Sequence, residues 1–120
     1  MVSYTRILLV DDSKLARMAM RAVVNDIMVD AEMLEAADAE TALDMLEHDR
    51  FDVVFMDYNM PGVDGLSAAT IIRERHPGAS IALVTAMAQD SIVEEAGRLS
   101  ISFITKPVRR QDVASFLTGA

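Results

Sequence analysis

The chain has 120 residues, a mass of 13.1 kDa and a net charge of −8, with 52% hydrophobic residues and no cysteine. The missing cysteine excludes a disulfide framework, a thiolate nucleophile and a cysteine-ligated zinc site. The acidic balance argues against direct nucleic-acid binding, because phosphate backbones are bound by clusters of Lys and Arg. No apolar run approaches the roughly 20 residues of a membrane-spanning helix. We therefore expect a single domain, residues 1–120, in the cytoplasm.

Five short segments rich in apolar residues predict β-strands. Four of them are almost wholly apolar and lack the alternation of a half-exposed strand, which favours a parallel sheet covered on both faces. The second is more polar and suits an edge of the sheet. The expected strands span Ile7–Val10, Met33–Ala36, Asp52–Met56, Ile81–Thr85 and Ser102–Thr105.

Helical patterns fill the intervals after these strands. The first helix follows Asp12 and Ser13, either of which could cap it, and the second follows Asp38. The third stops before Pro77, and the fourth contains Gly97, which predicts an interrupted helix. The expected helices span Lys14–Val24, Ala39–Glu47, Leu66–Arg75, Asp90–Leu99 and a last segment that begins after Pro107 and runs to about Leu117.

Five successive strand–helix units predict an α/β fold with right-handed crossovers and a doubly wound sheet. Ligands of such sheets bind beyond the carboxyl ends of the strands. Asp11 and Asp12 follow the first strand, Asp57 follows the third, Thr85 ends the fourth, and Lys106 follows the fifth. The second strand is followed only by alanines, as an edge position away from the ligand would allow. We expect the five polar side chains to converge on one pocket.

Three carboxylates in one pocket repel one another, and a divalent cation would relieve that repulsion. Ligation by oxygen alone favours Mg²⁺, Mn²⁺ or Ca²⁺ over zinc, and Mg²⁺ leaves room for a phosphate oxygen. Lys106 would add a second positive charge, and Thr85 would donate a hydrogen bond to the bound anion. The pattern predicts a phosphoryl-transfer site with Asp57 as the nucleophile.

The segments ILLVDDS (7–13), VVFMDYNMPGVDG (53–65), ALVTA (82–86) and FITKP (103–107) resemble, in order and spacing, the receiver domain of two-component response regulators. The resemblance extends over essentially the whole chain. It implies a flavodoxin-like three-layer sandwich of five strand–helix units, with five parallel strands in the order 2-1-3-4-5. It also implies a signalling switch controlled by phosphorylation.

The resemblance implies a role for each residue of the pocket. Asp57 would accept a phosphoryl group from a phosphohistidine, and Lys106 would pair with the phosphoryl oxygens. Thr85 would move to bond one of those oxygens while Phe103 turns inward. These shifts would change the surface of the fourth helix, fifth strand and fifth helix, and so control a downstream protein or a fused output domain. The bond before Pro107 resembles one that is cis in the family.

The resemblance also implies a metal site. Asp12 and Asp57 would bind Mg²⁺ directly, Asp11 would act mainly through water, and the backbone carbonyl of Asn59 would complete the protein ligands. Mn²⁺ would be a substitute for Mg²⁺. Asp64, in the same loop as Asn59, is expected to serve the turn into the third helix and not to be a ligand.

The first helix carries an apolar arc wider than packing on one side of a sheet requires. One interpretation is a docking patch for a sensor histidine kinase or a histidine phosphotransfer protein, formed by Leu15, Ala16 and Ala19 with Pro107. The other is that small alanines on a surface have no binding role. A monomer is expected, and dimerisation on phosphorylation stays open.

Two other functions compete with the switch. A Mg²⁺-dependent phosphatase or phosphotransferase for small molecules shares this chemistry, but 120 residues leave no obvious room for a cap over a substrate. A scaffold that is never phosphorylated would have no need of all five polar residues. We therefore expect a phosphoacceptor that catalyses its own phosphorylation and is not a turnover enzyme. Slow to intermediate self-dephosphorylation is expected, since Met87 beside the pocket cannot orient a water molecule by hydrogen bonding.

Overall fold

The structure is a computed structural model that describes residues 5–87 and 89–119. Strands and helices alternate along this part of the chain. The strands are β1 (Arg6–Val10), β2 (Glu32–Ala36), β3 (Val53–Asp57), β4 (Ser80–Thr85) and β5 (Ser102–Thr105). The helices are α1 (Lys14–Ile27), α2 (Ala39–His48), α3 (Gly65–Arg75), α4 (Asp90–Arg98) and α5 (Arg110–Thr118).

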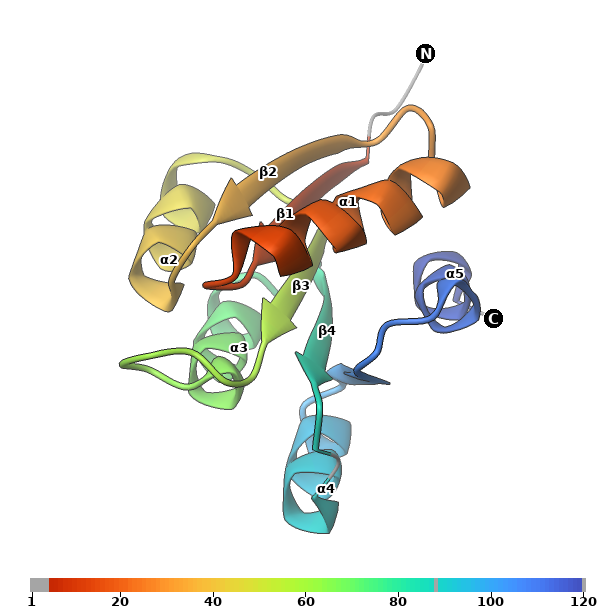
Figure 1. Cartoon of the computed structure of the whole chain (residues 1–120). Coiled ribbons are helices and arrows are strands. Elements are labelled where there is room, and N and C mark those ends of the chain that lie inside the picture. Colours follow the sequence, from red (N-terminus) through yellow and green to blue (C-terminus); the bar gives the residue numbers. More distant parts are fainter. Residues whose placement is uncertain (1–4, 88, 120) are drawn as a thin grey trace.

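The five strands form one parallel sheet in the order β2-β1-β3-β4-β5. Helices α1 and α5 cover one face, and α2, α3 and α4 cover the other (Figure 1). The predicted three-layer sandwich, its strand order and the edge position of the second strand are confirmed. Because every strand is parallel, all five carboxyl ends lie along one edge of the sheet.

Each strand contributes to two cores because successive side chains point to opposite faces. In β1, Leu8 and Val10 pack under α2 and α3, whereas Ile7 and Leu9 pack under α1 and α5. All four are at most 2% exposed. Burial on both faces explains why β1, β3 and β4 are apolar without alternation. The edge strands β2 and β5 are only partly buried, so β5 is less covered than its sequence predicted.

The helix starts follow the predicted caps. The Ser13 hydroxyl accepts a hydrogen bond from the Ala16 amide at the start of α1, so Ser13 and not Asp12 is the cap. Asp38 accepts from the Thr41 amide at the start of α2. Both caps satisfy amides that have no partner within the helix.

Two helices differ from the sequence predictions. Helix α1 continues past Val24 to Ile27, where no glycine or proline stops it. Helix α4 runs without a break through Gly97, so the predicted interruption is wrong. Burial of Ile92 and Ala96 against the sheet holds α4 in place and offsets the roughly 1 kcal/mol that a glycine costs within a helix.

Within the described part of the chain, no helix has both the length and the apolar character to cross a membrane. The expected domain limits, residues 1 and 120, lie outside the described residues.

Candidate phosphoryl-acceptor and metal site

Asp57 is the last residue of β3 and is only 4% exposed. The chain beyond it is held tightly against the sheet, since the Tyr58 amide donates to the Val84 carbonyl at 2.9 Å. Gly65, the first residue of α3, passes so close that a Cβ there would lie 2.2 Å from the Asp57 carbonyl oxygen. The backbone around Asp57 is therefore fixed from both the strand and the following helix.

Asp11 and Asp12 lie at the carboxyl end of β1, next to Asp57. One carboxylate oxygen from each of the three residues falls within 4.8 Å of the others. Asp11 is 9% exposed and its Oδ1 accepts from the Ser13 amide at 2.9 Å, whereas Asp12 is open to solvent. A set of oxygen donors with one exposed side is what a hydrated Mg²⁺ requires, so the residues present fit that ion.

Lys106 extends from the end of β5 into the same cluster. Its Nζ lies 3.0 Å from Asp57 Oδ1 and 3.4 Å from Asp11 Oδ2. The Lys106 amide donates to the Thr85 carbonyl at 2.7 Å, which fixes where the side chain begins. The bond between Lys106 and Pro107 is cis, as the resemblance implied.

The electrostatic balance of the site favours a further cation. Burial raises the pKa of the Asp57 carboxyl above its ordinary value; the hydrogen bond from Lys106 opposes this, and the charges of Asp11 and Asp12 add to it. Burial by itself lowers the pKa of Lys106. The hydrogen bonds and negative charges of Asp57 and Asp11 have the opposite effect and leave the pKa of Lys106 raised. One ammonium thus does not compensate three carboxylates.

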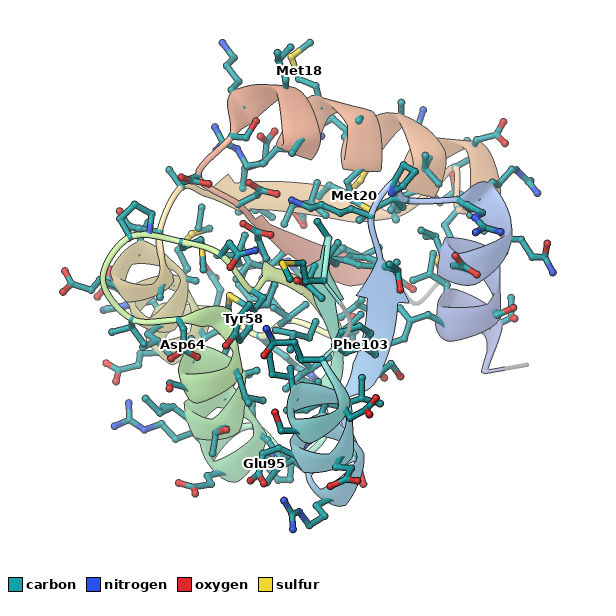
Figure 2. All side chains as sticks on the ribbon, turned by 60° about the horizontal axis from the view of Figure 1, so that its bottom comes forward. Met18, Met20, Tyr58, Asp64, Glu95 and Phe103 are labelled. Carbon is teal, nitrogen blue, oxygen red and sulfur yellow. The ribbon has the colours of Figure 1, made fainter. Side chains whose placement is uncertain are left out.

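The two expected switch residues occupy different environments. Thr85 is fully buried, and its hydroxyl accepts from the Met87 amide at 3.2 Å and lies 3.4 Å from the Met87 carbonyl. Among the described residues, no hydrogen bond joins the Thr85 hydroxyl to Asp57 or to Lys106. Phe103 on β5 is half-buried and packs against the core on the α4 side of the sheet, where it is labelled in Figure 2.

Three of the four expected docking residues line a groove between α1 and the loop from β5 to α5. This groove has a volume of about 320 Å³, and its lining includes Ala16, Ala19 and Pro107 as well as Asp57. Leu15 lies outside the lining and is 78% exposed. Asn59, the expected backbone ligand, is exposed after β3.

Met18 extends this apolar surface along α1. It is 53% exposed and lies on the outer side of the helix, whereas Met20 faces the sheet and is 8% exposed (Figure 2). The apolar arc seen in the sequence is therefore divided between a buried side and a solvent side.

Sequence reasoning missed one set of contacts beside the acids. Arg17 donates to the Asp11 carbonyl and to Glu35 of β2. The predicted site drew only on residues that follow each strand, and β2 is followed by alanine. Glu35 lies one residue before the end of β2, level with Leu9, and faces α1. The sequence did offer a signal for these contacts. Glu35 is an acid within the edge strand, and Arg17 and Arg21 lie one turn apart on the preceding helix.

A doubly wound parallel sheet with three clustered carboxylates and a lysine at its carboxyl edge defines an α/β domain whose ligand pocket is acidic. A model of the response regulator receiver domain matches residues 7–118. The chain belongs to the family of response regulator receiver domains.

Two curated relatives match the chain over nearly their whole length. Protein CcdB of Bacillus subtilis is 39% identical over 113 residues, 91% of each chain. Chemotaxis protein CheY of Listeria monocytogenes is 32% identical over 119 residues, 96% of this chain and 97% of that protein. The chain spans only half of the glycerol metabolism activator of Pseudomonas putida, with 33% identity over 110 residues.

Among solved structures, chemotaxis protein CheY4 of Vibrio cholerae has a TM-score of 0.85 and 24% identity, and the match covers 98% of both chains. At that identity the likeness supports the fold alone. The fold and the family therefore rest on independent comparisons.

Proposed function

We propose that this protein is a phosphorylation-activated signalling switch whose acceptor is Asp57. The donor is a phosphohistidine of a sensor histidine kinase or a histidine phosphotransfer protein, encountered in the cytoplasm. The observation that carries the proposal is the buried Asp57 carboxylate, 3.0 Å from Lys106 Nζ and clustered with Asp11 and Asp12. A carboxylate in this setting is held in place for attack on an electrophile that brings its own negative charge.

In the transfer step, an Asp57 carboxylate oxygen attacks phosphorus. The new O–P bond forms as the P–N bond of the phosphohistidine breaks, and the imidazole nitrogen keeps the electron pair. Lys106 moves with the charge, from the carboxylate to a phosphoryl oxygen. Asp57 is thus the acceptor and Lys106 the group that stabilises the transferred charge. The protein modifies itself and turns over no external substrate.

Asp11, Asp12, Asp57 and the Asn59 carbonyl are the groups that would hold Mg²⁺, or Mn²⁺ in its place. Bound there, the ion would neutralise negative charge shared between the carboxylates and the phosphoryl oxygens. Asp11, whose Oδ1 accepts a hydrogen bond from the Ser13 amide, would act mainly through a water molecule.

Phosphorylation adds about −1.5 to −2 charges and strong acceptor oxygens. Thr85 would exchange its contacts with the Met87 backbone for one of these oxygens, and Phe103 would move further into the core. The surface of α4, β5 and α5 then differs between the two states. That difference would control a downstream protein or a fused output domain.

The donor would dock on α1. Leu15 and Met18 are exposed apolar side chains, and Ala16, Ala19 and Pro107 border the groove that leads to Asp57. Small residues next to larger apolar ones suit the packing of a partner helix.

The test is phosphoryl uptake from a small acyl-phosphate donor in Mg²⁺, with an acid quench and measurement of intact mass. Wild type and the control Asp64→Asn should gain one phosphoryl group, because Asp64 only caps α3 and Asn caps equally well. Asp57→Asn, and wild type without divalent cation, should gain none. An adduct that persists in Asp57→Asn would contradict the proposal.

A further inference from the structure

Arg17 joins the acidic loop to the edge of the sheet. It lies on α1 and its side chain is only 14% exposed. One guanidinium nitrogen donates to the Asp11 carbonyl oxygen at 2.5 Å, and Nε donates to Glu35 Oε1 at 2.8 Å. The guanidinium therefore bridges a backbone oxygen of the acid cluster and a carboxylate of β2.

Glu35 in turn fixes the orientation of Arg17. Its second oxygen, Oε2, accepts from Arg21 at 2.8 and 3.1 Å, and Arg21 also donates to the Met33 carbonyl at 3.2 Å. Arg21 thus contacts the other oxygen of Glu35 and the backbone of β2, but it does not reach Asp11. The two arginines share one carboxylate and differ in what else they contact.

The Asp11 carbonyl has a particular importance, because it belongs to the peptide plane that connects Asp11 to Asp12. This planar unit fixes the position of the Asp12 Cα, and together with the φ angle of Asp12 it sets where the Cβ of Asp12 points. The amide on the other side of Asp11 is held by the Ala36 carbonyl at 3.1 Å. Among the described residues, no hydrogen bond or ion pair reaches the Asp12 side chain, so the backbone alone orients it.

Resting on the proposed function, we propose that Arg17 is a positioning residue that holds the Asp11–Asp12 peptide in the orientation that binds Mg²⁺, with Glu35 keeping the guanidinium in place. Arg17 is not a ligand and does not contact the transferred group. A positive charge near the acids would by itself weaken cation binding, so the tighter binding that we assign to Arg17 comes from geometry. Groups that orient metal ligands in this way commonly change affinity by about 10- to 100-fold.

Lysine is not expected to replace Arg17. The arginine fork donates in two directions at once, to the carbonyl and to the carboxylate, whereas a lysine ammonium on a flexible stem is a single point charge. Arg17→Lys keeps the charge and therefore separates geometry from electrostatics.

The experiment measures divalent-cation affinity directly. Mn²⁺ binding is followed by the electron paramagnetic resonance signal of the free ion, and Mg²⁺ affinity by competition, for wild type, Arg17→Gln, Arg17→Lys and Arg21→Gln. Both Arg17 variants should bind about tenfold more weakly, and Arg21→Gln, the matched control, should stay within about twofold of wild type. Circular dichroism checks that all four are folded.

A second readout separates positioning from catalysis. Phosphoryl uptake from a small donor, measured against Mg²⁺ concentration, should shift to about tenfold higher Mg²⁺ in Arg17→Gln and return nearly to the wild-type rate at saturation. Equal weakening in Arg21→Gln, or unchanged cation affinity in Arg17→Gln, would overturn the inference. Wild type that binds no cation and takes up no phosphoryl group would instead refute the proposed function.

Discussion

Lys106 Nζ lies 3.0 Å from Asp57 Oδ1, and this contact joins the ends of β5 and β3 across the intervening strand β4. The Asp57 side chain is 5% exposed and that of Lys106 is 32% exposed. Solvent therefore reaches the pair mainly at Lys106. The lysine charge is the main compensation for the buried Asp57 carboxylate.

Lys106→Met should destabilise the protein without divalent cation by about 1–2 kcal/mol, which lies between the effects of losing an exposed pair and a fully buried pair because Lys106 is partly exposed. Added Mg²⁺ should restore part of the loss, since it supplies the missing positive charge. Urea unfolding followed by far-UV circular dichroism, with and without Mg²⁺, measures both effects. Lys14→Met, an exposed site on α1, is the control and should change little.

Gly65→Ala should destabilise the fold by about 2–4 kcal/mol, because the new Cβ would meet the Asp57 carbonyl oxygen, which cannot move without distorting β3. Gly97→Ala is the matched control. Nothing lies within 4 Å of a Cβ at that position in α4, so it should stabilise by about 0.5–1 kcal/mol. Equal unfolding free energies for the two variants would contradict the close approach at Gly65.

Glu35 should stabilise the protein in a pH-dependent manner. Hydrogen bonds from Arg17 and then Arg21 lower the pKa of its carboxyl, against a smaller opposing effect of burial. A lowered folded-state pKa contributes stability that is present above the ordinary glutamate value and is lost as pH falls through the lowered one.

Glu35→Gln should therefore unfold at a lower temperature than wild type at neutral pH, and the difference should vanish on acidification. About 1 kcal/mol or less is expected for partly exposed pairs. Thermal unfolding followed by circular dichroism across pH provides the measurement. A difference that grows as pH falls would have the wrong sign for these ion pairs.

Ala19→Glu should slow phosphoryl transfer from a phosphorylated histidine phosphotransfer protein by about tenfold or more, since a charge would have to be buried in the apolar contact. Uptake from a small acyl phosphate should be unaffected. Thr41→Glu places the same charge on α2, on the opposite face of the sheet, and serves as the control. Equal slowing with both donors would show damage to the site and not to docking.

Local sequence predicts most of the fold because each strand or helix has its own pattern of apolar residues, and some helices also have their own capping residue. Apolar runs such as Ile7–Val10 predict buried parallel strands. Ser13 and Asp38 cap their helices by accepting hydrogen bonds from backbone amides of the first turn. The ends of helices were harder to predict. Nothing in the residues after Val24 marks a stop, and Gly97 signals a break that packing of its neighbours prevents.

For the site, the sequence determined which groups are near one another, because parallel strands place their carboxyl ends on one edge and Asp11, Asp12, Asp57 and Lys106 follow those ends. Only the tertiary structure decided how these groups are held. The bridge from Arg17 to the Asp11 carbonyl and Glu35, and the hydrogen bonds that occupy Thr85 with Met87, depend on side-chain directions and helix placement that no local pattern encodes. Proximity follows from strand order, whereas orientation follows from packing between layers.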